Sequence, residues 1–257
     1  MIPIFIISNR KHSGKTFLAL GLAMKLTEMG YKIGYIKPVG RTPVKKGYGV
    51  YDIDAVFIRE ALSLHEELDT VSPFVAGYEA QNALFEGGAQ DARQKVLKAI
   101  ESQQNKDFVI IGGAGDIFEG ASFNIDAMSL ISDINASALV VEAWTGNESA
   151  DLFIGMANLL GKRMIGGVLN KVPQNLSTHA KDNVVPFLEK RGIKMFGVFG
   201  KDNILESITV KDITEVLNGK VLCCEDKLEE FVENFSVGAM DVDSALVYFS
   251  RTQNKAV

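Results

Sequence analysis

The chain has 257 residues, a formal net charge of −5 and 47% apolar residues, which is enough for one large domain with a small appendage. This acidic balance, with no long run of Lys or Arg, argues against nucleic acid as a partner. No apolar run approaches the ~20 residues of a membrane span and the chain does not start like a signal peptide, so we expect a cytoplasmic protein without a membrane partner.

The start of the chain predicts a strand, a phosphate-binding loop and a helix. The apolar run 2–7 leads through polar residues to Gly14, Lys15 and Thr16, and residues 16–29 continue with apolar residues at helical spacing. A helix N-terminus after such a loop presents free N–H groups and a positive dipole end to a phosphate. Gly14 allows close approach of the backbone, Lys15 carries a charge to the β and γ oxygens, and Thr16 is placed to bind Mg²⁺.

Only the second half of the phosphate-loop motif is present, because Asn9 stands where the full motif has glycine. A GKT run at an ordinary exposed helix start is the alternative interpretation. The strand before it and the helix after it favour phosphate binding, with His12 and Ser13 as further nucleotide-binding residues.

The following segments alternate between strand and helix patterns. Further strands are predicted at 32–36, 107–112, 138–142, 164–170 and 194–199, and helices at 53–62, 78–85, 91–101, 150–160 and 176–190. Six strands in this alternation predict an α/β fold, with a doubly wound, mostly parallel sheet covered by helices on both faces, of the phosphate-loop NTPase type. The polar residues 38–51 predict a loop at the carboxyl edge of the sheet, where ligands bind.

Three carboxylates are candidates for this edge. Asp52 and Asp54 open the helix predicted at 53–62, where they either cap the helix or help to bind a metal. Asp116 is the first carboxylate after the strand 107–112, at a strand end that normally carries an acidic Mg²⁺ ligand in phosphate-loop proteins.

The chain is predicted to divide into a nucleotide-binding domain, 1–218, and a C-terminal appendage, 219–257. The appendage is too small to bury a core alone, so we expect it to dock on the main domain, on another subunit or on a separate module. From Thr209 onward the predicted elements are a short helix ended by Gly219, a strand at 221–224, an acidic helix at 225–235 and a helical segment at 241–251.

Several of these segments together resemble the dethiobiotin synthetase superfamily of phosphate-loop enzymes, which includes the enzymes that form cobyrinic acid amides. The shared features are SGKT at 13–16, KPVG at 37–40, Asp54 at a helix start, GAG at 113–115 and a strand that ends in Asn170.

A closer resemblance is to the dethiobiotin-synthetase-like N-terminal region of long bacterial phosphotransacetylases. That region has KPVG after its second strand and leads into a regulatory module that is often entered by a VGAM stretch. VGAM stands here at 237–240. The appendage therefore resembles the start of a regulatory module.

The resemblance implies ATP and Mg²⁺ as cofactors, with residues 14–16 at the phosphates and the metal. It also implies that Lys37 neutralises charge on a transferring phosphoryl group, that Asp54 binds the metal and that Asn170 reads the adenine edge. Without the resemblance, other interpretations are open: Lys37 could be a solvated strand end, Asp54 a helix cap and Asn170 part of an ordinary turn. Homodimers are a further expectation from the resemblance.

The chain departs from the ligases at two places. Gly112 stands where their strand ends in a glutamate that binds the metal, so a metal held by Thr16 and Asp54 would keep more water unless Asp116 or Glu119 approaches. The loop is also more basic, with Arg10, Lys11 and His12 in place of acidic and hydroxyl residues.

Two functions from different classes remain open. One is an ATP-dependent carboxylate–amine ligase that acts through an acyl phosphate on a small carboxylate substrate, with Lys15 and Lys37 as catalytic residues. The other is a nucleotide-binding regulatory or ATPase module with little turnover, which Gly112 and the VGAM tail favour. A metal-insertion or partitioning ATPase is a third, since Arg10 lies near a second basic loop position of that group.

Overall fold

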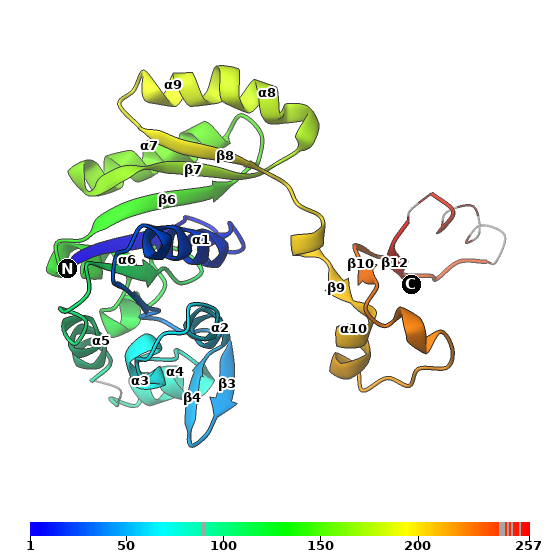
Figure 1. Ribbon diagram of the computed structural model, residues 1–257, viewed down its shortest axis with the longest axis horizontal. Coiled ribbons are helices and arrows are strands. Elements are labelled where there is room, and N and C mark those ends of the chain that lie inside the picture. Colours follow the sequence, from blue (N-terminus) through cyan, green and yellow to red (C-terminus); the bar gives the residue numbers. More distant parts are fainter. Residues whose placement is uncertain (89–90, 242–244, 246, 248, 252) are drawn as a thin grey trace. The chain divides into compact units, whose positions relative to one another are not determined.

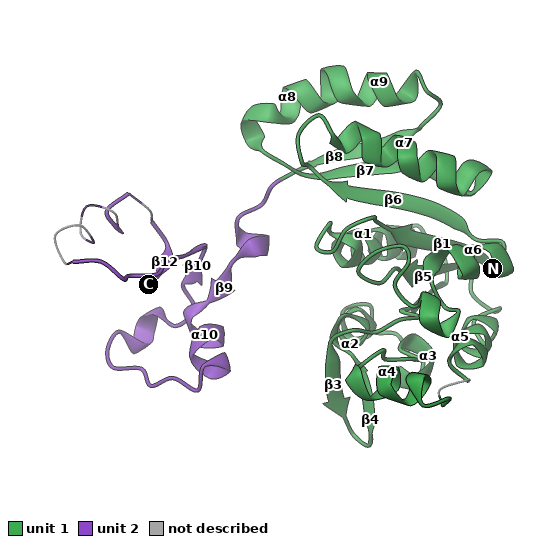
Figure 2. Ribbon diagram, turned by 180° about the vertical axis from the view of Figure 1, so that it is seen from behind, with its two compact units in different colours: residues 1–200 green, residues 201–257 purple. Residues whose placement is uncertain are grey.

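The computed structural model describes residues 1–88, 91–241, 245, 247, 249–251 and 253–257, and these divide into two compact units (Figure 1). Unit 1 comprises residues 1–200 and unit 2 residues 201–257 (Figure 2). The division falls at the end of the last sheet strand, ahead of the boundary after Asn218 that the sequence predicts, because the chain leaves the sheet of unit 1 at Gly200.

Unit 1 is built on a six-stranded, fully parallel sheet in the order β2-β5-β1-β6-β7-β8. The strands are β1 (Ile2–Ile7), β2 (Ile33–Ile36), β5 (Phe108–Gly112), β6 (Ser137–Ala143), β7 (Met164–Val172) and β8 (Met195–Gly200). The α/β fold class and the six strands predicted from the sequence are confirmed.

The apolar strands are continuous because both faces of the sheet are covered. In β1, Phe5 and Ile7 belong to one buried cluster and Ile4 and Ile6 to the other, as the alternation of a strand requires. One face is covered by α5 (Ala92–Glu101), α6 (Ala127–Asp133), α7 (Ser149–Leu160) and α9 (Val185–Glu189), and the other by α1 (Lys15–Glu28), α2 (Ile53–Ala61) and α3 (Leu68–Val71).

The strand order places a ligand-binding edge near the centre of the sheet. The chain runs outward from β1 to β2, returns to β5 beside β1, and then crosses to β6 on the other side of β1. In such sheets ligands bind beyond the carboxyl ends of the strands at the point where the order reverses. The phosphate loop after β1 lies at that point.

The segment predicted as a loop at 38–51 instead forms an antiparallel hairpin of β3 (Pro43–Lys46) and β4 (Gly49–Asp52). A two-residue connection joins the strands, with Gly47 at a φ of 61°. Such short hairpin turns require a positive φ that glycine adopts easily. The prediction was wrong here because polar composition outweighed this turn signal.

The helix predicted at 176–190 is present but irregular. It starts with α8 (Ser177–His179) after a 3-10 turn at Gln174–Leu176, widens into a π-helical segment at Ala180–Val184, and ends in α9. Pro186 has no N–H and its ring crowds the carbonyl four residues earlier, which accounts for the change of helical pitch. The described chain also contains the predicted α4 (Tyr78–Phe85).

Within its described residues, unit 2 contains α10 (Val210–Val216), capped by Thr209, and two strand pairings of two residues each. The predicted strand at 221–224 and helix at 225–235 are wrong, since only a 3-10 turn at Glu225–Lys227 forms. It is followed by β10 (Phe231–Val232), which pairs with β9 (Ile208–Thr209), and by β11 (Asn234–Phe235), which pairs with β12 (Lys255–Ala256). Like charges at helical spacing disfavour a helix in this acidic run, while Phe231 and Val232 favour a strand.

The helix predicted at 241–251 includes residues outside the described part of the chain. None of the described helices has the length and apolar character needed to cross a membrane.

Phe153 tests the packing of unit 1. Its ring is fully buried and lies against Gly167, where an added Cβ would come within 2.5 Å of Cε1. We expect Phe153→Ala to lower the free energy of unfolding by about 3–5 kcal/mol, because it leaves a cavity in the core. Urea unfolding followed by the fluorescence of Trp144, the single tryptophan of the chain, measures this change within unit 1.

Phe118 provides the control, since its side chain is 59% exposed. Phe118→Ala should change the stability by less than ~0.5 kcal/mol. Equal effects of the two substitutions would contradict the described core.

Candidate functional site

The site is assembled from the carboxyl ends of five neighbouring strands. The residues that each strand end contributes are Lys15 and Thr16 after β1, Lys37 after β2, Gly112 at β5, Glu142 at β6 and Asn170 at β7. The predicted convergence on the carboxyl edge is therefore seen in the structure.

Lys15 is held by carbonyl groups beneath the phosphate loop. Its Nζ donates to the carbonyl oxygens of Arg10 and Gly115, both at 2.9 Å, and the residue is only 9% exposed. Burial lowers the pKa of Lys15 to about 8, although nearby Glu142 opposes this shift. Lys15 is thus a buried cation whose hydrogen-bond partners are neutral.

Glu142 lies under the loop and was not singled out from the sequence. It is fully buried, and its carboxylate accepts from the Asn9 N–H at 2.7 Å and from the Ser8 hydroxyl at 3.4 Å. Burial raises the pKa of Glu142, while the bond from Asn9 and the charge of Lys15 act in the opposite direction. The signal in the sequence was a carboxylate near the end of an otherwise apolar strand.

Asn170 contacts the loop directly. Its Nδ2 donates to the carbonyl of Ser13 at 3.0 Å, and a Cβ built on Gly14 would lie 2.1 Å from that nitrogen. Gly14 also has a φ of 96°. Both the close approach and the positive φ explain why glycine occupies position 14. The expected contact of Asn170 with adenine stays a prediction.

His12 and Ser13 differ in their availability to a ligand. His12 is exposed at a φ of 57°, and no described residue bonds to its ring. Ser13 is buried, where its hydroxyl donates to the Arg10 carbonyl at 3.0 Å and accepts from Ser8 Oγ at 2.6 Å. The Ser13 side chain therefore stabilises the loop. The predicted nucleotide binding by Ser13 would then use its backbone.

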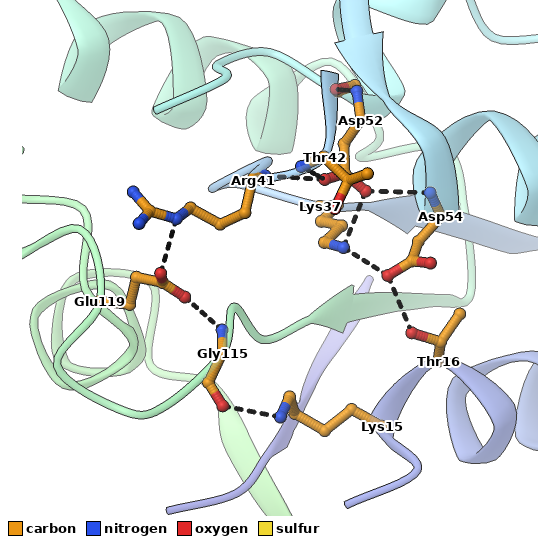
Figure 3. A network of polar contacts seen from close by, with 10 residues as sticks. Lys15, Thr16, Lys37, Arg41, Thr42, Asp52, Asp54, Gly115 and Glu119 are labelled. Carbon is orange, nitrogen blue, oxygen red and sulfur yellow. Dashed lines mark hydrogen bonds and ion pairs between the residues drawn. The ribbon is translucent and has the colours of Figure 1, made fainter. Parts of the chain in front are cut away.

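Lys37 lies between two carboxylates, as Figure 3 shows. Its Nζ is 2.7 Å from Asp52 Oδ1 and 2.6 Å from Asp54 Oδ2, and the latter oxygen also accepts from Thr16 Oγ1 at 3.1 Å. Lys37 is therefore a buried, paired cation and not a solvated strand end.

Asp52 and Asp54 differ in their burial and in their hydrogen-bond partners. Asp52 is fully buried and accepts N–H bonds from Arg41, Thr42 and Asp54 at 2.8, 3.1 and 3.0 Å, so it is the helix cap. The Asp54 side chain is 40% exposed and meets Thr16 instead. Asp54 thus retains the access to solvent that a metal ligand needs.

A further set of contacts closes this network into a ring (Figure 3). Glu119 accepts from the Gly115 N–H and pairs with Arg41 Nε at 2.7 Å. The Gly115 carbonyl accepts from Lys15, and the backbone N–H of Arg41 donates to Asp52. The phosphate loop is therefore connected to the hairpin β3–β4 on both sides. Arg41 was not among the residues predicted for the site.

Asp116 occupies the turn after β5. Its Oδ1 accepts from the backbone N–H groups of Phe118 and Glu119 at 2.9 and 3.0 Å. The structure thus shows Asp116 as a turn cap, and its expected role as a metal ligand is still a prediction.

The oxygen donors at Thr16 and Asp54 fit a hydrated Mg²⁺ that enters with a nucleotide. No group of three or more His, Cys, Asp or Glu in the described part of the chain could hold a metal. Mg²⁺ is usually bound through one or two carboxylates together with substrate phosphates and water. One ammonium of Lys37 faces two carboxylates, which leaves one negative charge for a cation.

The strand order, the loop between β1 and α1 and the lysine at its end define a phosphate-loop NTPase-type domain. A family model described as an AAA domain (AAA_26) matches residues 3–224, and the chain belongs to this family.

Two relatives are similar over most of the chain. The chain is 23% identical over 251 residues to the phosphate acetyltransferase of Synechocystis sp., a match that covers 95% of the chain but only 35% of that protein. It is 25% identical over 225 residues to the ATP-dependent dethiobiotin synthetase BioD of Clostridium perfringens, covering 84% of the chain and 98% of that protein. These relatives confirm the resemblance expected from the motifs.

Among solved structures, the MinD cell division protein of Aquifex aeolicus is similar, with a TM-score of 0.47 and 15% identity, covering 79% of this chain and 83% of that one.

The lowered pKa of Lys15 makes nucleotide affinity dependent on pH. A bound polyphosphate favours the protonated lysine, so binding takes up a proton where the free protein has lost it. The affinity for ATP should be nearly constant near pH 7, where Lys15 is mostly protonated, and should fall as pH rises through about 8. Calorimetry in buffers of different ionisation enthalpy measures the proton uptake.

Glu142→Gln provides the matched comparison. It removes a charge that raises the pKa of Lys15, so the loss of affinity should begin at lower pH than in the unmodified protein. An affinity that is flat to pH 9.5 in both proteins would contradict the described environment of Lys15.

Proposed function

We propose that unit 1 binds ATP with Mg²⁺ at the carboxyl edge of the sheet and acts as a nucleotide-responsive regulatory or ATPase module. The proposal is based on the ring of contacts in Figure 3, one side of which leads from Lys15 through Glu119, Arg41 and Asp52 to Lys37. A triphosphate in the loop would compete for Lys15, which is one link of this ring.

The chemistry of Lys15 favours that exchange. Bonds between an ammonium and a phosphate are stronger than bonds to neutral carbonyls, so a phosphate would draw Lys15 away from Gly115. Gly115 is bonded to Glu119, and Glu119 to Arg41. Nucleotide binding would thereby change the contacts that hold the hairpin β3–β4.

Thr16 and Asp54 would hold the metal, and Asn170 and the backbone of residues 12–14 would hold the nucleotide. Bound Mg²⁺ would supply charge neutralisation at the phosphates. Lys37 would approach the terminal phosphate while remaining paired with Asp52, so that it is oriented before the nucleotide binds.

Two observations support a regulatory or slow ATPase role. The strand end at Gly112 provides no carboxylate for catalysis. The similarity to the phosphate acetyltransferase includes the tail, since it covers 95% of this chain, whereas the similarity to the dethiobiotin synthetase covers 84%.

A carboxylate–amine ligase is the second candidate, and the 98% coverage of the dethiobiotin synthetase favours it. In that reaction ATP phosphorylates a small carboxylate, an amine attacks the acyl phosphate, and phosphate leaves as the C–N bond forms. Lys15 and Lys37 would stabilise charge on the phosphoryl group.

Lys15→Ala tests nucleotide binding. We expect the affinity for ATP–Mg²⁺ to fall about 100-fold in isothermal titration, because the charge-assisted bonds of Lys15 are lost. Lys25→Ala in the same helix is the control, since its side chain is 70% exposed and faces Glu28. Unchanged affinity in Lys15→Ala would refute the site.

Phosphate release separates the two candidate functions. A regulatory module should release phosphate well below ~1 s⁻¹, and amino-carboxylates should leave the rate unchanged. Turnover that reaches this rate only with an amino-carboxylate would overturn the regulatory proposal in favour of the ligase. The expected homodimer is a separate proposal, for which light scattering should give twice the 28.0 kDa chain mass.

A further inference from the structure

Tyr35 fills the corner that Gly112 leaves open. Tyr35 pairs with Ile110 across β2 and β5, and Ile110 and Gly112 lie on the same face of the sheet. A Cβ built on Gly112 would be 2.4 Å from Tyr35 Oη and 3.1 Å from Cζ. The phenol ring therefore leans along the sheet toward its carboxyl edge, on the face that α1 and α2 cover.

The hydroxyl of Tyr35 has no partner within the described part of the protein. The residue is 1% exposed, yet no described residue forms a hydrogen bond with Oη. The described side-chain atoms that are both enclosed and unpaired are Glu66 Oε2 and Gln103 Oε1, so Tyr35 Oη is not fully enclosed. A buried side chain thus has one polar atom without a partner among the described residues.

Two carboxylates, both paired with Lys37, influence this hydroxyl. Burial raises the pKa of Tyr35 well above its usual value, and the charges of Asp54 and Asp52 raise it further. The hydroxyl is therefore neutral and lies within the electrostatic influence of both carboxylates. Both oxygens of Asp52 already accept bonds from other donors, and Asp54 Oδ2 accepts from Lys37 and Thr16.

We propose that Tyr35 is a positioning residue for the divalent cation, and that its hydroxyl accepts a hydrogen bond from a water molecule bound to that cation. This inference rests on the proposed nucleotide site. Thr16 and Asp54 would supply the direct oxygen donors, and Tyr35 would orient a metal-bound water beside Gly112. Because Gly112 has no side chain, this place is open to the phenol.

The consequence is a metal that is held chiefly through its water shell at this corner. Groups that bond to the ligands of a metal typically change its affinity by about 10- to 100-fold when they are removed. A phenol that only filled the core would have no such effect, because phenylalanine fills the same space.

The test is isothermal titration of ATP in EDTA and in Mn²⁺, with the full chain. The ratio of the two affinities reports the contribution of the metal. We expect Tyr35→Phe to reduce this ratio about 10-fold, while the affinity in EDTA stays within about twofold of that of the unmodified protein. Tyr31→Phe is the control, since Tyr31 is 41% exposed and packs on Phe108 at the opposite end of β5.

Gly112→Ala is a second variant that displaces the hydroxyl without removing it. Its added Cβ should lower the ratio in the native background and should have less effect when combined with Tyr35→Phe. Thermal unfolding midpoints of the variants establish that the fold is retained.

The outcomes are distinct. An unchanged ratio in Tyr35→Phe overturns the inference, as does an equal loss of affinity in EDTA, which would mean that the hydroxyl contacts the nucleotide. No binding of ATP to the unmodified protein in either condition would instead refute the proposed function itself.

Discussion

The position of Lys37 between Asp52 and Asp54 is the interaction on which the geometry of the site depends. Charged partners stabilise an ammonium at this depth, because an unpaired buried charge is costly. Asp52 can be one of them only if the hairpin β3–β4 returns the chain to α2, and Asp54 follows in the first turn of that helix. Through Thr16 the same group reaches α1. One buried cation thus connects β2, α2 and α1.

The two lysines of the site are held in different ways, and the difference indicates which one a ligand can move. Lys37 is bound by two charges, whereas the bonds of Lys15 go to neutral carbonyls. An arriving anion gains little by displacing the carboxylates of Lys37 but improves on the partners of Lys15. A ligand would therefore displace Lys15 from its partners more readily than Lys37.

The sequence was sufficient to predict the sheet and the site residues that belong to motifs. Lys15, Thr16, Lys37 and Asp54 were predicted to converge, since parallel strands end at one edge, and the structure brings them together. Contacts between distant segments could not be predicted in the same way. Arg41 looked like part of a polar loop, because its partner Glu119 lies far away in the chain.

The tail shows the other limit of pattern-based prediction. Residues 225–235 contain helix-forming residues, but short strands form at 231–232 and 234–235 because pairing with 208–209 and 255–256 decides the local conformation. Gly112 is a third kind of case. The sequence shows that position 112 has no carboxylate, but only the structure shows that the Tyr35 side chain lies beside it.

The close approach of Asn170 to Gly14 has a consequence for how this loop can evolve. Any side chain at position 14 collides with the amide of Asn170, which in turn holds the carbonyl of Ser13. Glycine at position 14 is therefore required both by its own φ of 96° and by a residue from which 155 others separate it in the chain. Replacing Asn170 with a smaller residue would relieve the collision but not the backbone strain at position 14, so a directed-evolution library of this loop should keep this glycine fixed and vary the residues around it.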